Sequence, residues 1–103
     1  ARKVQSVAAY EKTVQQAFRE VADLLVARDT LQQQLTSQTS WVQSQQQRLR
    51  VMEVRYAQGA ANQFDVLDAQ RDALNAQQSR VQVLRQLLGT TAQLYKALGG
   101  GES

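Results

Sequence analysis

Two aspartates in close succession are the residues of this sequence most able to do chemistry. Asp65 and Asp68 stand in the stretch RYAQGAANQFDVLDAQR, residues 55–71, where glycine and asparagine interrupt a long polar chain. Paired carboxylates serve general acid–base catalysis when they line a pocket, and rings of them attract cations when they surround an aqueous opening. The rest of the sequence decides between these uses.

The composition argues against an enzyme. The chain has no cysteine and no histidine, which removes disulfides, zinc clusters, thiol nucleophiles and the commonest general base. No glycine-rich phosphate loop follows a strand, because the sequence predicts no strands. We therefore expect no catalytic residue, no metal and no cofactor.

The charges and the hydropathy restrict the kinds of partner. The chain has 12 Lys and Arg against 9 Asp and Glu, a net charge of +3 with the signs interspersed. This pattern favours an ordinary solvated surface over a nucleic-acid interface. No apolar run approaches the roughly 18 residues of a membrane span. The chain starts without methionine inside an already helical pattern, so we expect a fragment or a processed chain.

A seven-residue repeat predicts an all-α fold. Apolar residues recur at this spacing in two separate rows, with Arg28 as the one exception. The first row is Val7, Val14, Val21, Arg28, Leu35, Val42, Leu49 and Tyr56, and the second is Leu67, Leu74, Val81, Leu88 and Tyr95. Proline is absent and most residues are good helix formers, so the repeat indicates helices that coil around their neighbours.

The break between the rows predicts one long antiparallel helical hairpin over residues 1–103, with coiled-coil packing. We expect helices over about residues 3–57 and 64–97, a turn over about 58–63 and a glycine-rich end over 99–103. Gly59 suits the left-handed conformation that ends a helix. Asn62 suits the N-cap of the next helix, with Asp65 three residues later as in a capping box. A short connection makes the two helices antiparallel neighbours.

The two rows are expected to face each other. Tyr56 then meets Leu67, Leu49 meets Leu74, Val42 meets Val81, Leu35 meets Leu88, and Arg28 stacks on Tyr95 in a cation–π contact. Away from the turn the apolar stripe widens through Phe18, Leu24, Leu25 and Leu31 on one helix and Leu84, Leu87, Leu94 and Leu98 on the other. About twenty N-terminal residues find no partner in the chain, and their apolar face predicts self-association.

Three stretches resemble one known family. AYEKTVQQAFREVADLLVAR, Ala9–Arg28, resembles the start of the second long periplasmic helix of TolC-like outer membrane factors, with the OprM branch as the nearest match. RYAQGAANQFDVLDAQ is similar to the periplasmic turn of that family. LYKALGGG, Leu94–Gly101, is similar to the end of its last periplasmic helix. The three stretches stand in the family's order and span nearly the whole chain.

The resemblance implies a place in a larger assembly. This chain would be the later of two helical hairpins that each protomer adds to the periplasmic α-barrel of a homotrimeric channel in the outer membrane of a Gram-negative bacterium. The channel would be a passive conduit and gate in a tripartite efflux or export pump. Its partners would be two further copies, a periplasmic adaptor (membrane fusion protein) and an inner-membrane transporter, with no role for nucleic acid.

The resemblance also assigns residues around the turn. Asp65 and Asp68 match the aspartates that ring the periplasmic entrance, and Tyr56 matches a tyrosine that links neighbouring coils in the closed state. Gly59, with Ala60 beside it, matches the turn that the adaptor contacts. Ala61 stands where some relatives have an arginine that ties the gate shut, so that link is not expected here.

Simpler explanations stand beside these roles. Asp65 serves equally well as a helix cap, and plain packing explains Tyr56 as well as gating does. Asp68 lies between the like charges of Asp65 and Asp72, which disfavours a purely solvated role, and together with the resemblance this favours a gate. A stand-alone coiled-coil scaffold or adaptor protein is the alternative function, because the periodicity alone supports it. The D-V-L-D motif favours the channel, because a scaffold does not need it.

Overall fold

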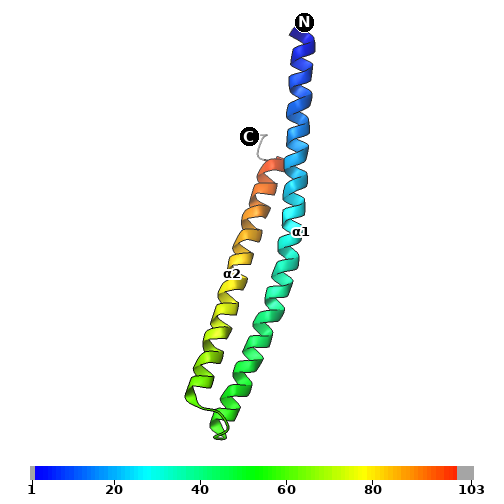
Figure 1. The fold of residues 1–103 in the computed structure, drawn as a ribbon. Helices are drawn as coiled ribbons and strands as arrows, with labels where there is room; N and C mark the ends of the chain where they lie inside the picture. The colour runs from blue at the N-terminus through cyan, green and yellow to red at the C-terminus, as the bar shows by residue number, and fades with distance from the viewer. Residues whose placement is uncertain (1, 100–103) are drawn as a thin grey trace.

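The computed structural model of the chain describes residues 2–99, with side chains from residue 6 onward. It contains two helices, α1 at Arg2–Ala57 and α2 at Gln63–Gly99, and the described residues form no strand. The helices run antiparallel and are joined by a short turn (Figure 1). The all-α antiparallel hairpin expected from the sequence is confirmed. Of the glycine-rich end expected over 99–103, Gly99 is the last residue of α2, and residues 100–103 lie outside the described residues.

Both helices are long because the sequence offers little that would end them. Proline is absent, and no glycine precedes Gly59. The 56 residues of α1 rise about 84 Å at 1.5 Å per residue, in agreement with the 85 Å length of the molecule. α2 has 37 residues, so the N-terminal part of α1 extends beyond the end of α2 (Figure 1).

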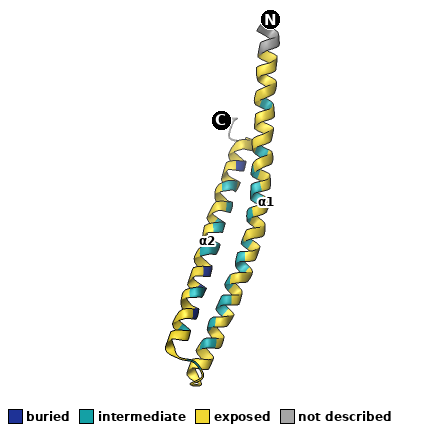
Figure 2. Cartoon of the chain, in the orientation of Figure 1, coloured by how far each residue is buried: buried dark blue, intermediate teal, exposed yellow. Residues whose placement is uncertain are grey.

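α1 turns the expected seven-residue row toward α2. The row is partly shielded from solvent at Val14, Val21, Arg28, Leu35, Val42 and Leu49. Figure 2 shows the partly buried positions of each helix on the side that faces the other helix. The two ends of the row are more exposed than its middle. Val7 is 56% exposed beyond the end of α2, and Tyr56 is 49% exposed beside the turn. Val14 lies beyond the end of α2, so the prediction for α1 is confirmed from Val21 to Leu49.

α2 does not turn the expected row toward α1. Leu67, Leu74, Val81, Leu88 and Tyr95 are between 42% and 80% exposed. The shielded row lies one position earlier in each repeat, at Val66, Ala73, Arg80, Leu87 and Leu94. One residue corresponds to about 100° of rotation around a helix. The prediction that the Leu67 row packs on α1 is therefore wrong, and with it the pairs formed by that row, including the cation–π contact of Arg28 with Tyr95.

Small side chains explain part of this orientation. Ala69, Ala73 and Ala76 are 1%, 5% and 2% exposed, which makes them the most buried residues of the half of α2 near the turn. Alanine lets the backbone of α2 approach α1 closely, so that many atoms gain van der Waals contacts. The seven-residue repeat was identified from the large apolar residues, so these alanines counted for less in the prediction than the leucines beside them.

Two polar side-chain contacts also join the helices in this orientation. Arg80 donates a hydrogen bond from Nε to Oγ1 of Thr39 at 2.9 Å, and the Thr39 hydroxyl donates in turn to the carbonyl oxygen of Leu35 at 2.8 Å. Arg48 pairs with Asp72 at 2.7 Å, again from α1 to α2. Both contacts need the observed side of α2 to face α1.

Away from the turn the interface is built from larger apolar side chains. Leu24, Leu31, Leu84, Leu87 and Leu94 are partly or fully buried, as expected. Phe18, Leu25 and Leu98 are 71%, 47% and 65% exposed, so the predicted widening of the apolar interface at these three residues is wrong. Two helices meet along one narrow line of contact, and residues on the flanks of that line stay in water.

We expect Ala76→Leu to lower the free energy of unfolding by about 1–3 kcal/mol, because Ala76 is 2% exposed and a larger side chain forces the helices apart. Gln77→Leu is the matched control. The neighbouring exposed residue gains the same side chain and should change the free energy of unfolding by less than about 0.5 kcal/mol. Urea unfolding followed by circular dichroism measures both. Equal effects would contradict the interface assigned to α2.

Candidate functional site

The turn between the helices is held by its own backbone hydrogen bonds. Ala60 donates its N–H to the carbonyl oxygen of Arg55 at 2.7 Å, and Gly59 donates to that of Tyr56 at 3.0 Å. Together these bonds form a Schellman motif, which satisfies carbonyl groups at the end of a helix. Gly59 has φ of 78°, a left-handed conformation that costs other residues about 1–2 kcal/mol. The left-handed glycine predicted from the sequence is confirmed.

α2 begins with a reciprocal capping box. The Asp65 N–H donates to Oδ1 of Asn62 at 2.9 Å, and the Asn62 N–H donates to Oδ2 of Asp65 at 3.1 Å. Two N–H groups that the helix cannot satisfy internally thus gain acceptors. A carboxylate at this position also interacts favourably with the helix dipole. The predicted capping box is confirmed, and Asp65 has a structural role.

Asp68 makes no contact that the hairpin needs. Its Oδ1 accepts a hydrogen bond from Nη2 of Arg71 at 3.0 Å, one turn along the same helix, and the two side chains are 62% and 69% exposed. An exposed ion pair of this kind contributes about 0–1 kcal/mol. Asp72, one turn further, is held by Arg48 of α1. Of the three aspartates at the start of α2, Asp68 is therefore the one best placed to act on something outside the chain.

The structure brings the five predicted site residues to one end of the molecule. Tyr56, Gly59, Ala60, Asp65 and Asp68 lie in the turn or in the helical turns next to it, at the end remote from the N-terminus (Figure 1). All five are exposed. A partner that meets this end of the hairpin therefore meets them as one surface, and their roles in a channel remain predictions.

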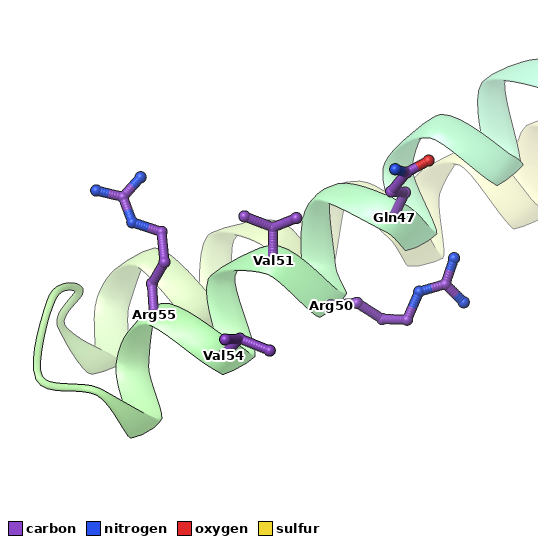
Figure 3. Close-up of a pocket in the computed structure, with 5 residues that line it drawn as sticks. All are labelled: Gln47, Arg50, Val51, Val54 and Arg55. Carbon is purple, nitrogen blue, oxygen red and sulfur yellow. The ribbon is translucent and has the colours of Figure 1, made fainter.

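A shallow groove on α1 next to the turn was not predicted from the sequence. The groove is lined by Gln47, Arg50, Val51, Val54 and Arg55, which project in two ridges with four-residue spacing (Figure 3). Val51 and Val54 are 48% and 55% exposed. Arg50 and Arg55 form no ion pair within the described part of the chain. The four-residue spacing of these residues in the sequence places them on one face of a helix. An apolar floor between two arginines suits contact with an apolar, acidic surface.

The side chains around the turn offer charge and shape to a partner. Among residues 2–99, no three His, Cys, Asp or Glu residues are grouped so that they could hold a metal ion. Neither of the two helices, as far as they are described, is long and apolar enough to cross a membrane. What the turn does present is a backbone fixed by hydrogen bonds and the exposed carboxylate of Asp68.

Comparison with known proteins identifies the family. The family model described as outer membrane efflux protein matches residues 1–100. The chain belongs to the outer membrane efflux protein family. The resemblance to TolC-like outer membrane factors, seen in three stretches of the sequence, is thereby confirmed.

Curated relatives of this outer membrane efflux protein chain match almost all of it. The probable efflux pump outer membrane protein TtgC of Pseudomonas putida strain KT2440 is 46% identical over 96 residues, 93% of this chain and 20% of that protein. The solvent efflux pump outer membrane protein SrpC of Pseudomonas putida is 44% identical over 97 residues, 94% of this chain and 21% of that protein. The probable outer membrane lipoprotein SilC of Salmonella typhimurium is 40% identical over 100 residues, 97% of this chain and 22% of that protein. The chain therefore spans about a fifth of the length of these relatives. No solved structure matches the chain.

We expect opposite effects from alanine at two glycines of this efflux protein chain. Gly59→Ala should lower the free energy of unfolding by about 1 kcal/mol, because alanine is strained at a φ of 78°. Gly89→Ala should raise it by about 0.5–1 kcal/mol, since Gly89 lies inside α2 with open space around it. Melting curves by circular dichroism measure both changes. A Gly59→Ala variant as stable as the parent would show that the turn in solution has another conformation.

Proposed function

We propose that this chain forms part of the wall of the periplasmic channel in an outer membrane efflux protein, where it acts as a passive conduit and gate. The observation that carries the proposal is the family match over residues 1–100, which coincides with one helical hairpin 85 Å long. A wall of this kind requires helices that pack on more than one side. Both helices leave large apolar side chains exposed outside their mutual interface, among them Val51 and Val54 of α1 and Leu74 and Leu88 of α2.

The proposal includes partners and a location. Three copies of the full-length protein form the channel, a periplasmic adaptor (membrane fusion protein) contacts the turn at Gly59 and Ala60, and an inner-membrane transporter supplies the cargo. The protein lies in the outer membrane of a Gram-negative bacterium, with this segment in the periplasm. The names of the relatives support this, because TtgC and SrpC are efflux pump outer membrane proteins and SilC is an outer membrane lipoprotein.

In this proposal Asp65 and Asp68 set the charge of the channel entrance. Asp65 caps α2, while Asp68 is 62% exposed and held by Arg71 alone. Three copies place six carboxylates around one narrow opening, which attracts cations and repels anions. Tyr56, 49% exposed at the same end, packs between neighbouring coils in the closed state.

A stand-alone coiled-coil scaffold or adaptor protein is the second candidate. The exposed row from Leu67 to Tyr95 favours it, because such a row suits any partner helix of the same period. A scaffold does not need exposed carboxylates beside its turn, whereas at a pore entrance they would attract cations. A test of the two aspartates therefore separates the candidates.

We expect Asp65→Asn with Asp68→Asn to lower the cation-over-anion selectivity of a full-length efflux protein that carries this hairpin by roughly tenfold, because charge is lost while size is kept. The free energy of unfolding of the hairpin should fall by no more than about 1 kcal/mol, since asparagine still accepts a hydrogen bond at the cap. Reversal potentials in planar bilayers measure selectivity, and circular dichroism measures stability.

The matched control is Asp23→Asn with Asp29→Asn, which removes the same charge from two exposed positions of α1 far from the turn. It should leave selectivity unchanged. Suppose instead that selectivity is the same in all three proteins and that the Asp65 and Asp68 variant alone loses much helix stability. The two aspartates are then structural caps, and the scaffold becomes the better explanation.

We also expect the isolated chain to sediment as a dimer or a larger bundle, because Leu74 and Leu88, 53% and 60% exposed, belong to a continuous apolar row. Leu74→Glu with Leu88→Glu should shift it toward the monomer. Gln78→Glu with Gln82→Glu adds the same charges at exposed positions of α2 outside that row and should shift it less. Analytical ultracentrifugation over a concentration series measures the masses. A parent chain that stays monomeric at high concentration would contradict the expectation.

A further inference from the structure

α2 carries two neighbouring seven-residue rows, and the structure uses the less apolar one against α1. The inward row is Val66, Ala73, Arg80, Leu87 and Leu94, and the outward row is Leu67, Leu74, Val81, Leu88 and Tyr95. The rows are one residue apart, so a rotation of α2 by about 100° around its own axis would exchange them.

Burial of apolar surface does not explain this choice in the half of α2 near the turn. The inward row there contributes Val66, Ala73 and Arg80. The outward row contributes Leu67, Leu74 and Val81, which are 49%, 53% and 42% exposed. The free energy gained by burial grows with the apolar area removed from water, so these three side chains favour the opposite orientation.

The residues flanking each row bring the two orientations closer in free energy. Ala69 and Ala76 flank the inward row and are buried at 1% and 2% exposure. Gln70 and Gln77 occupy the matching positions beside the outward row, and burying an amide without a partner is costly. Close packing of alanine on one side therefore offsets leucine burial on the other. The closer two orientations are in free energy, the more a few specific contacts decide between them.

Two polar contacts exist in the observed orientation alone. Nε of Arg80 donates to Oγ1 of Thr39 at 2.9 Å, and Nη1 of Arg48 pairs with Oδ2 of Asp72 at 2.7 Å. A rotation of α2 by about 100° would carry Arg80 and Asp72 away from α1 and break both. A polar residue at one inward position of a coiled coil is known to select one arrangement over competing ones.

We propose that Arg48 and Arg80 are positioning residues that hold α2 with its less apolar row against α1 and so keep the row from Leu67 to Tyr95 on the outside. In a channel wall the outward row is then available to a neighbouring helix. This consequence rests on the proposed function, whereas the orientation of α2 belongs to the chain by itself.

Single cysteines on the two rows report the orientation. In the parent chain, the thiol of Leu74→Cys should react with a maleimide at least about tenfold faster than that of Ala73→Cys, because the native side chains are 53% and 5% exposed. In an Arg48→Ala, Arg80→Ala background this ratio should fall by about tenfold or more, since α2 is free to turn its leucines inward. A dilution series separates burial within one chain from burial between copies, because only burial between copies is lost on dilution.

Two control backgrounds make the test specific. Arg50→Ala with Arg85→Ala removes one exposed arginine from each helix away from the interface and should leave the ratio unchanged. Arg48→Asp with Asp72→Arg, in an otherwise unchanged chain, restores an ion pair with its partners exchanged and should keep the parent ratio. Circular dichroism checks that each variant remains helical.

Two results would overturn the proposal. In the first, the labelling ratio of the Arg48→Ala, Arg80→Ala chain equals that of the parent, which would mean that the turn and the alanines alone orient α2. In the second, this variant loses its helix content, which would mean that no alternative packing of the leucines is available. Neither outcome bears on the channel function, because the selectivity of Asp65 and Asp68 variants is measured separately.

Discussion

Two helices can cover only one face of each other, and this constraint underlies the other features of the hairpin. In the described part of the chain, the buried apolar side chains are Ala69, Ala73, Ala76 and Leu94, whereas exposed large apolar residues occur along both helices. So thin an interface contributes little burial, and long helices in water are marginal without tertiary packing. Further burial must come from surfaces outside the hairpin. Membership of the outer membrane efflux protein family fits such a component, because the relatives are about five times as long.

The turn links this constraint to the candidate site. A Schellman motif at Gly59 and a capping box at Asn62 hold the two ends of the connection between Ala57 and Gln63 with hydrogen bonds. The cap requires a carboxylate or a similar acceptor at residue 65, and Asp68 follows one helical turn later on a neighbouring part of the surface. Asp65 thus stabilises the fold as a cap, whereas Asp68 adds a charge that the fold does not need.

Much of the hairpin could be predicted from the sequence because its determinants are local. The absence of proline, the row from Val21 to Leu49, and the glycine and asparagine of the turn act over a few residues each, and the structure bears them out. The orientation of α2 could not be predicted in the same way. A seven-residue repeat has the same period in adjacent rows, and the leucines of the outward row outweigh the alanines in any count of apolar residues.

The contacts that distinguish the two rows join residues far apart in the chain. Arg80 reaches Thr39 and Asp72 reaches Arg48 across the interface, and only the folded hairpin brings them together. The groove between Arg50 and Arg55 was not predicted for a related reason. The side of α1 that α2 leaves uncovered, where these residues lie, is defined only once the position of α2 is known.

The unbroken course of α1 has a mechanical consequence. Sharp kinks in helices arise at proline, at glycine or at local bulges, and the 56 residues of α1 contain neither proline nor glycine. Bending is therefore spread gently along the whole helix, which behaves as a lever. A tilt of about 5° at its N-terminal end displaces the turn by about 7 Å over the 85 Å length of the molecule. That distance is more than half the diameter of a helix, so a small rotation far from the turn becomes a large displacement of its carboxylates.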